Sequence, residues 1–471
     1  MALGRDWSGE LLFPPRDDAQ VASELHTALE RNVGQVRSLL KATAPGISFR
    51  GPEVSSPGVD VTDARSAGWS VLLHADDTSN TELLDAIRVL AEHRGADLST
   101  PLVFRSEPPA RWLDWLHAEY LKREDVGLVV PRYLLIVGGP DRVPFAFQAY
   151  LQTFAHVGRV DFGTDVAALR TYAEKIVRLE TAPEPVVDRR VLMFAPDGGI
   201  DDPTHYSREY MVKPLAAHVR KKFQIAVDEI AEDDATKEAL VAACSTSRPA
   251  LVYTASHGLG ATSQPLDIQR RYNGAICCHA DGPLSLGSMF SADDVPMDRP
   301  FLEGAVFFQF ACYGLGTPAQ SDFAHWIDGA PSSNAPADFV AALPTKLLSH
   351  PRGPISFVGH LDIALLLGFT DAKQPILTER WHTRIAPFRS AVERVMSVRP
   401  TGYALERMNQ KYAAASTILT LRYDEEKRNE RGWTSKDADD LLDTWLSRGD
   451  AQNFMVLGDP AARLRIPAVA S

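Results

Sequence analysis

The chain has 471 residues, of which 45% are hydrophobic and 23% are charged, and its net charge is −12. This composition is typical of a globular protein of two or three domains and argues against a disordered or low-complexity chain. The acidic balance disfavours a protein that binds the phosphate backbone of nucleic acids. No run of residues approaches the ~18 apolar residues of a membrane span. We therefore expect neither a nucleic-acid partner nor a membrane partner.

The cysteines and the first residues of the chain indicate the cellular compartment in which the protein is expected. Four cysteines with no C-x-x-C pair fit neither a disulfide scaffold nor a zinc site, so no metal site is predicted. The first 16 residues contain charged side chains and lack the apolar centre of a signal peptide. We expect a cytoplasmic protein with reduced thiols. No cofactor is expected, although the acidic composition leaves room for a structural or activating Ca²⁺.

Residues 1–64 are mostly polar and are expected to form an N-terminal region that packs on the body of the protein or regulates it. One helical pattern runs through residues 22–41. From residue 65 apolar strands and amphipathic helices alternate, and we interpret residues 65–186 as a first α/β unit. Its predicted elements are strands at 69–73 and 133–137 and helices at 81–94, 111–122 and 167–180.

Residues 187–471 have the pattern of a second α/β unit. The predicted strands are 190–195, 249–255, 305–311, 354–358 and 454–457, and the predicted helices are 209–223, 337–348 and 401–421. Continuous apolar strands separated by helices indicate a mostly parallel sheet covered on both faces. The predicted fold class is therefore α/β, with two tandem α/β subdomains in a three-layer arrangement.

Two of the predicted strands end in residues that could carry chemistry. His257 and Gly258 follow the strand at 249–255, and Cys312 follows the strand at 305–311. A lone cysteine at a strand end is usually a buried thiol, and a lone His-Gly pair is usually a turn. Carboxyl ends of neighbouring parallel strands meet at one edge, however, where a thiolate nucleophile and an imidazole acid/base could act together. The backbone N–H groups of Gly258 and Cys312 would then be the oxyanion donors.

The order and spacing of these residues resemble the caspase-fold cysteine peptidases, and within them the gingipain-like branch. His257 precedes Cys312 by 55 residues, and in caspases a histidine lies ~50 residues before a cysteine set in Q-A-C-x-G. The sequence 311–314 matches the Ala, Cys and Gly of that motif, while Phe310 replaces its Gln. The strand and turn at 133–145 and the closing Gly-Asp-Pro turn at 458–460 are also similar to the family, and the resemblance covers about residues 130–467.

This resemblance implies a cysteine endopeptidase with a Cys–His dyad in a catalytic caspase-like subdomain at 187–471, after a non-catalytic one at 65–186. It implies a protein or peptide substrate with a basic residue before the scissile bond (P1), because a carboxylate pairs well with a guanidinium. The candidate carboxylates are Asp202, Asp201, Glu209 and Asp362. It also implies regulated intracellular proteolysis, as in bacterial antiviral defence or cell death, with an upstream activator or an operon partner protein.

Two alternatives stay open at this point. The first is a caspase-fold interaction module without turnover, which would bind partners through its cleft. The second is an amidase that uses the same nucleophile. Labelling of Cys312 by an alkylating peptide, and its loss in His257→Ala, would distinguish an enzyme from an interaction module.

Overall fold

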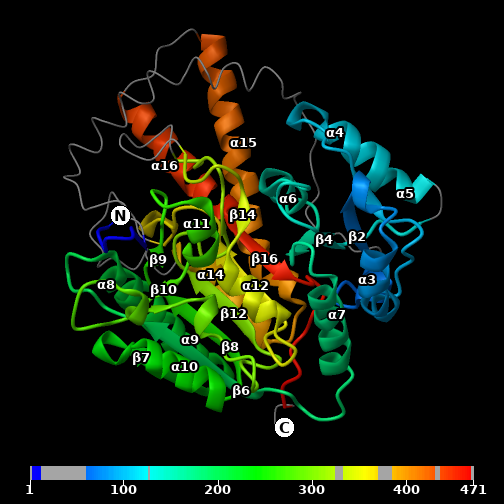
Figure 1. Ribbon diagram of the computed structural model, residues 1–471. Helices are drawn as coiled ribbons and strands as arrows, with labels where there is room; N and C mark the ends of the chain where they lie inside the picture. The colour runs from blue at the N-terminus through cyan, green and yellow to red at the C-terminus, as the bar shows by residue number, and fades with distance from the viewer. Residues whose placement is uncertain are drawn as a thin grey trace.

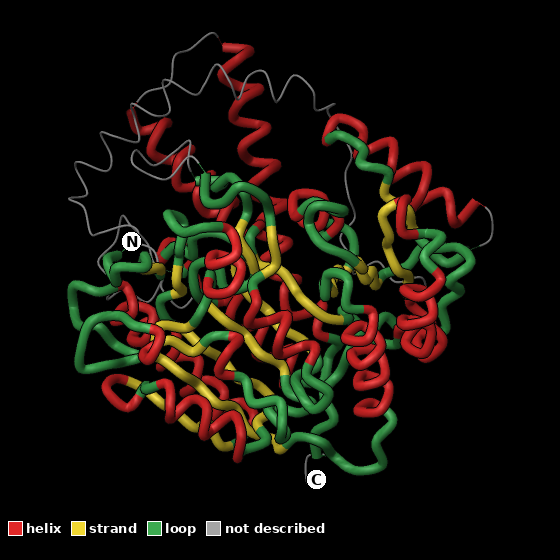
Figure 2. Tube along the Cα trace, in the orientation of Figure 1, coloured by secondary structure: helices red, strands yellow, loops and turns green. Residues whose placement is uncertain are grey.

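The computed structural model describes residues 3–11, 60–125, 128–323, 333–369, 384–429 and 435–467. A ten-stranded sheet crosses the centre of these residues, and helices lie around it (Figures 1 and 2). The helical pattern predicted at 22–41 lies outside the described residues. None of the described helices is both long enough and apolar enough to cross a membrane.

Both predicted α/β units contribute to this single sheet. Its strands, in spatial order, are β3 (Leu102–Phe104), β2 (Trp69–His74), β4 (Tyr133–Val137), β5 (His156–Val160), β16 (Phe454–Gly458), β15 (Ser356–His360), β12 (Val306–Phe310), β8 (Pro249–Ala255), β6 (Asp188–Ala195) and β7 (Ala226–Ala231). The last strand of the chain, β16, lies between the strands of the first unit and those of the second. The units are therefore joined by hydrogen bonds across the middle of the sheet.

The strand direction reverses once across this sheet. The pairs from β3 to β16 are parallel, and so are the pairs from β15 to β7, but β15 and β16 are antiparallel. The carboxyl ends of β8, β12 and β15 consequently point to the edge opposite to the carboxyl ends of β2, β4 and β5. The predicted mostly parallel sheet is confirmed, with this one reversal.

The contact between β5 and β16 requires a glycine. A Cβ added to Gly158 would lie 2.1 Å from the carbonyl oxygen of Gly458. No side chain can approach a backbone oxygen so closely, so any larger residue would push these two strands apart. Gly158 therefore permits the seam at which the two halves of the sheet join.

Helices cover both faces of the sheet. They are α2 (Ala64–Ala67), α3 (Thr81–Arg94), α4 (Trp112–Trp115), α5 (Lys122–Asp125), α6 (Phe145–Leu151), α7 (Val166–Glu180), α8 (Pro203–Ser207), α9 (Lys213–Phe223), α10 (Lys237–Thr246), α11 (Leu266–Tyr272), α12 (Ala342–Ser349), α14 (Ala386–Met396), α15 (Glu406–Asn429) and α16 (Ser435–Gln452). Asn80 and Asp165 cap the amino ends of α3 and α7, which pack against each other. The carboxamide and carboxylate oxygens satisfy backbone N–H groups that have no partner within the helix.

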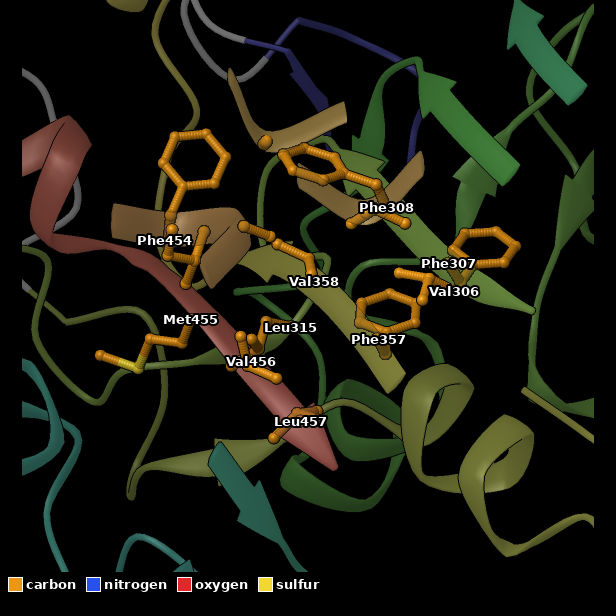
Figure 3. Packing of buried hydrophobic residues seen from close by; sticks show 14 of the residues in the cluster. Val306, Phe307, Phe308, Leu315, Phe357, Val358, Phe454, Met455, Val456 and Leu457 are labelled. Carbon is orange, nitrogen blue, oxygen red and sulfur yellow. The ribbon is translucent and has the colours of Figure 1, made fainter. Parts of the chain in front are cut away.

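Alternate side chains of β2 and of β4 enter different hydrophobic clusters. In β2, Val71 and Leu73 belong to the main core, whereas Leu72 packs in a second cluster with Phe147 and Trp115. This is the two-residue period of a sheet that is buried on both faces. Around β12 and β15 the core is rich in aromatic rings, and Phe307 stacks on Phe357 with ring centroids 5.3 Å apart (Figure 3).

Short strands at the end of the main sheet form a second, four-stranded sheet. Its order is β1 (Gly4–Arg5), β9 (Gly258–Leu259), β10 (Ile276–Cys277) and β11 (Met289–Phe290). Strands β13 (Gly316–Thr317) and β14 (Phe339–Val340) pair separately. Because β9 begins directly after His257, this small sheet extends the end of β8 and brings residues 4–5 beside it.

A buried ionic network ties the turn after β16 to helices α3 and α7. Asp459 accepts hydrogen bonds from Arg94 at 2.8 Å and from the indole of Trp69 at 2.9 Å, and Arg94 also bonds both carboxylate oxygens of Glu180 at 2.7 Å. Burial would raise the pKa of Glu180, but the charge of Arg94 and the hydrogen bond from His93 outweigh it and lower that pKa to about 2. Asp459 belongs to the Gly-Asp-Pro turn that the sequence singled out.

We expect Asp459→Ala to lower the free energy of unfolding by about 3–5 kcal/mol, because it leaves the buried Arg94 with one carboxylate partner fewer. Urea denaturation measures the loss, and Arg88→Ala, which removes an exposed ion pair with Asp85, is the matched control and should leave the transition unchanged. The depressed pKa of Glu180 adds stability above pH ~4.5 that is lost as pH falls toward 2. Equal transitions for both variants would contradict this role of the network.

Candidate active site

The pairing of β8 with β12 brings His257 and Cys312 to one edge of the sheet. Ala255 is paired with Phe310. His257 lies two positions after Ala255, and Cys312 lies two positions after Phe310. The N–H of Ser256 donates to the carbonyl of Phe310 at 3.3 Å, which continues the contact past the last ladder pair. Sequence reasoning placed these two residues at a common edge, and the strand register accounts for that placement.

Gly258 brings the two strand ends together at backbone distance. A Cβ added to Gly258 would lie 2.0 Å from the carbonyl oxygen of Cys312. The φ angle of Gly258 is not in the left-handed region, so the requirement for glycine comes from this approach alone. Any other residue would separate the histidine strand from the cysteine strand.

Asp202 holds the imidazole of His257. The Nε2 atom of His257 lies 2.8 Å from Oδ1 and 3.0 Å from Oδ2 of Asp202. The same carboxylate caps α8, since Oδ1 accepts from the N–H of Thr204 at 2.8 Å and from its hydroxyl at 2.6 Å. Burial would raise the pKa of Asp202, but the hydrogen bonds and the charge of His257 outweigh burial and hold that pKa below its ordinary value. Asp202 is therefore an ionised acceptor that orients the ring.

This orientation decides which ring nitrogen is free. With Nε2–H donating to the carboxylate of Asp202, the neutral ring carries its lone pair on Nδ1. The Nδ1 atom is buried and has no hydrogen-bond partner among the described residues. Burial lowers the pKa of His257, and Asp202 opposes that effect. His257 thus presents an unprotonated nitrogen in the manner of a general base.

The thiol of Cys312 is fully enclosed. Its Sγ accepts a hydrogen bond from the N–H of Ala364 at 3.3 Å, which comes from the segment after β15. None of the side chain is exposed, and burial raises the pKa of the Cys312 thiol. In this conformation Cys312 is a protonated thiol without access to solvent.

A single carbonyl oxygen receives both candidate oxyanion donors. The carbonyl oxygen of Leu3 accepts from the N–H of Gly258 at 3.0 Å and from the N–H of Cys312 at 2.9 Å. These distances are those of an oxyanion hole around the oxygen of a reacting carbonyl. The sequence predicted these two donors but not the contact with Leu3, because a few residues in a polar lead-in carry no pattern that indicates where they bind.

The predicted P1 acids do not gather in one pocket. Asp201 is exposed, and Glu209 pairs with its neighbours Arg208 and Lys213. Asp362 is fully buried, and its carboxylate accepts from the hydroxyl of Ser321 at 2.8 Å, from the N–H of Asp322 at 2.9 Å and from the amide of Asn334 at 3.3 Å. Burial raises the pKa of Asp362 to about 6.

These positions change the roles of the predicted acids. The carboxylate of Asp362 accepts hydrogen bonds from the loop that follows Cys312, and the carboxylate of Asp202 accepts one from His257. In this conformation Asp362 is enclosed by that loop, and the carboxylate of Asp202 is shared between His257 and the guanidinium of Arg5, 2.6 Å away. The expectation of a basic P1 residue loses these supports and stays a prediction. The burial of Asp362 and the contact between Asp202 and His257 could not be read from their acidic neighbourhoods.

The remaining cysteines do not form a metal site. No group of three or more His, Cys, Asp or Glu side chains with metal-binding geometry occurs within the described residues. Cys277 pairs in β10, and the thiol of Cys278 contacts the carbonyl of Ile276 at 3.6 Å. Both thiols are buried, and burial raises the pKa of each.

Comparison with known proteins identifies the fold. A structure described as a protease aligns with a TM-score of 0.50 at 10% identity, over 86% of this chain and 82% of its own. The Arg-specific cysteine proteinase gingipain R aligns with 0.45 at 13%, over 88% and 80%. Its Porphyromonas gingivalis complex of pro- and mature domains aligns with 0.45 at 13%, over 84% and 79%.

The α/β fold, with its large and mostly parallel sheet flanked by helices, was predicted from the sequence and is shared with the structure described as a protease. No family model matches the sequence, and no curated protein matches it. The likeness identifies the fold alone, so the chemistry has to be argued from the site.

We expect Asp202→Asn to lower the pKa of His257 further, because asparagine keeps the cap of α8 but removes the negative charge that opposes burial. Imidazole NMR titration measures this pKa, and Asp201→Asn, one residue away and exposed, is the matched control. A His257 pKa that is unchanged in Asp202→Asn would show that the carboxylate does not govern the ring.

Proposed function

We propose that the protein is a cysteine endopeptidase in which Cys312 is the nucleophile and His257 is the acid/base. One observation carries the proposal: the N–H groups of Gly258 and Cys312 converge on a single peptide carbonyl oxygen at 3.0 and 2.9 Å. The fold, shared with a structure described as a protease, supports the same assignment.

We propose the following reaction for these groups. His257 Nδ1 takes the proton of the Cys312 thiol, and the sulfur attacks the carbonyl carbon of the scissile bond. The carbonyl oxygen becomes an oxyanion, which the N–H groups of Gly258 and Cys312 stabilise. The C–N bond breaks as Nδ1 returns the proton to the leaving amine, and a thioester remains on Cys312.

Water completes the cycle. His257 Nδ1 accepts a proton from a water molecule that attacks the thioester, and the acid leaves as the thiol is regenerated. In both halves the imidazole passes through the imidazolium form, and the ionised carboxylate of Asp202 at 2.8 Å stabilises that cation. Asp202 is accordingly a positioning residue.

A polypeptide substrate fits this site better than a small amide. The carbonyl that the two N–H groups bind belongs to Leu3. The backbone after this carbonyl is held by strand pairing, since Gly4 and Arg5 run parallel to Gly258 and Leu259 in the small sheet. The N–H of Gly260 also donates to the carbonyl of Arg5 at 2.7 Å. Strand addition of this kind binds main chain of any sequence. It favours an endopeptidase over an amidase that releases only a terminal nitrogen.

The biological setting is a further expectation. Regulated proteolysis inside a bacterial cell, a role in antiviral defence, and an upstream activator or operon partner protein all come from the resemblance of the sequence to its family. Each of them stays a prediction. The chemistry of the site does not depend on any of them.

We expect Cys312→Ala to abolish both casein hydrolysis and alkylation by a peptidyl chloromethyl ketone mixture, because it removes the attacking sulfur. Intact mass spectrometry detects the label, its loss in Cys312→Ala assigns it to that thiol, and Cys244→Ala, which removes a buried thiol in α10, is the matched control. Both are measured in the Arg5→Ala background, where the ion pair from residue 5 to Asp202 is absent. Persistent hydrolysis in Cys312→Ala, or no thiol-dependent activity in any chain, would refute the proposed function in favour of an interaction module.

A further inference from the structure

Residues 3–11 of this chain lie along the candidate active site. Leu3 bonds both oxyanion donors, β1 pairs with β9, and an antiparallel bridge between Arg5 and Leu11 closes a short hairpin. Trp7 meets the ring of Tyr272 edge-on at 5.6 Å between centroids. The segment therefore has specific contacts along its length.

Both the N–H and the carbonyl group of Leu3 are hydrogen-bonded. Its carbonyl oxygen receives the two oxyanion donors, and its N–H donates to the carbonyl of Ala364 at 3.0 Å. The N–H of Ala364 donates in turn to Sγ of Cys312 at 3.3 Å. One short segment after β15 thus contacts both the nucleophile and the residue whose carbonyl lies in the oxyanion hole.

We propose that residues 3–5 occupy the substrate cleft as a substrate does, so that the cleft selects an uncharged, leucine-sized P1 side chain and stays closed to other substrates until this segment is displaced. The proposal rests on the endopeptidase function proposed above and names the substrate class of the same site. The Leu3–Gly4 bond has the position of the scissile bond.

The side chain of Leu3 supports an apolar P1 position. It is completely buried and belongs to the main hydrophobic core. A guanidinium in its place would lose its hydration and would need a carboxylate partner. Of the two buried acids predicted for this task, Asp362 is engaged by the loop after Cys312, and Asp202 lies on the other side of the reacting bond, where it binds Arg5 and His257.

Arg5 strengthens the closure because it acts on the catalytic machinery. Its guanidinium bonds Oδ2 of Asp202 at 2.6 Å and the carbonyl of Gly9 at 2.6 Å. The cation shares the carboxylate that orients His257, and its charge lowers the pKa of that histidine. While the segment is bound, His257 is thus less able to hold the proton of Cys312, whose thiol is shut off from solvent.

Covalent attachment makes the segment a strong competitor. A tethered ligand is present at an effective concentration of the order of mM, which free substrates seldom reach. Loss of the Arg5 ion pair or of the Leu3 side chain should therefore open the cleft without changing its walls. A partner that pulls residues 3–11 away would have the same effect.

The specificity test compares two chloromethyl ketone peptides that differ only in Leu or Arg at P1. They are applied to a full-length opened chain that carries Leu3→Asp and Arg5→Ala, and labelling of Cys312 is followed by intact mass. We expect the leucine reagent to react at least about 10-fold faster, the scale on which pockets discriminate apolar side chains. Equal rates, or faster labelling by the arginine reagent, would overturn the inference while the proposed function stands.

The closure test compares the opened chain with the parent chain and with Glu10→Gln, which changes an exposed charge on the same segment. We expect the leucine reagent to label the opened chain at least about 10-fold faster than the other two, which should react alike. Equal labelling of all three chains would show that the segment does not close the cleft. Melting temperatures verify that each variant is folded.

A binding test separates this inference from the proposed function. The opened chain that also carries Cys312→Ala is titrated by calorimetry with an acetylated peptide of the sequence of residues 3–11, and with the same peptide carrying arginine in place of Leu3. We expect only the leucine peptide to bind. If it binds but no reagent labels Cys312, the cleft assignment holds and the peptidase function fails; if neither peptide binds, the inference is wrong.

Discussion

The approach of two backbone segments, at Gly258 and at Cys312, is the contact on which the site depends. The carbonyl of Cys312 occupies the space where any other residue at position 258 would have its Cβ, with 2.0 Å between them. This packing places two N–H groups from different strands on the same oxygen. It requires β8 and β12 to be neighbours in register, and the ladder from Val306–Leu251 to Phe310–Ala255 provides that register.

The parts of the site that follow buried strands could be predicted from sequence. A strand buried on both faces is an unbroken apolar run, so the residues that end it, His257 and Cys312, stand out against it. The role of Asp202 could not be predicted in the same way. A carboxylate in a polar turn is typical of a helix cap, a solvated surface or a pocket, and here it caps α8 and also binds His257. Only the fold decides which partner lies opposite.

Longer-range features escaped the sequence for a different reason. The two-residue pairing of β1 with β9 joins positions more than 250 residues apart and involves too few residues to show any periodicity. The insertion of β16 between β5 and β15 is likewise a matter of topology, since an apolar strand of five residues does not show which neighbours it has or in which direction it runs. The strand itself was predicted, but its place in the sheet was not.

Because β15 and β16 are antiparallel, the strands of the two halves of the sheet have their carboxyl ends at opposite rims. Asp459 follows β16 at the rim where β15 begins, whereas Cys312 lies past the end of β12 at the other rim. The loops after β2, β4 and β5 share the rim of Asp459, so they turn away from the thiol even though carboxyl ends of strands are the usual place for chemistry in α/β folds. The loops after β2, β4 and β5 therefore lie at the edge of the sheet opposite to Cys312.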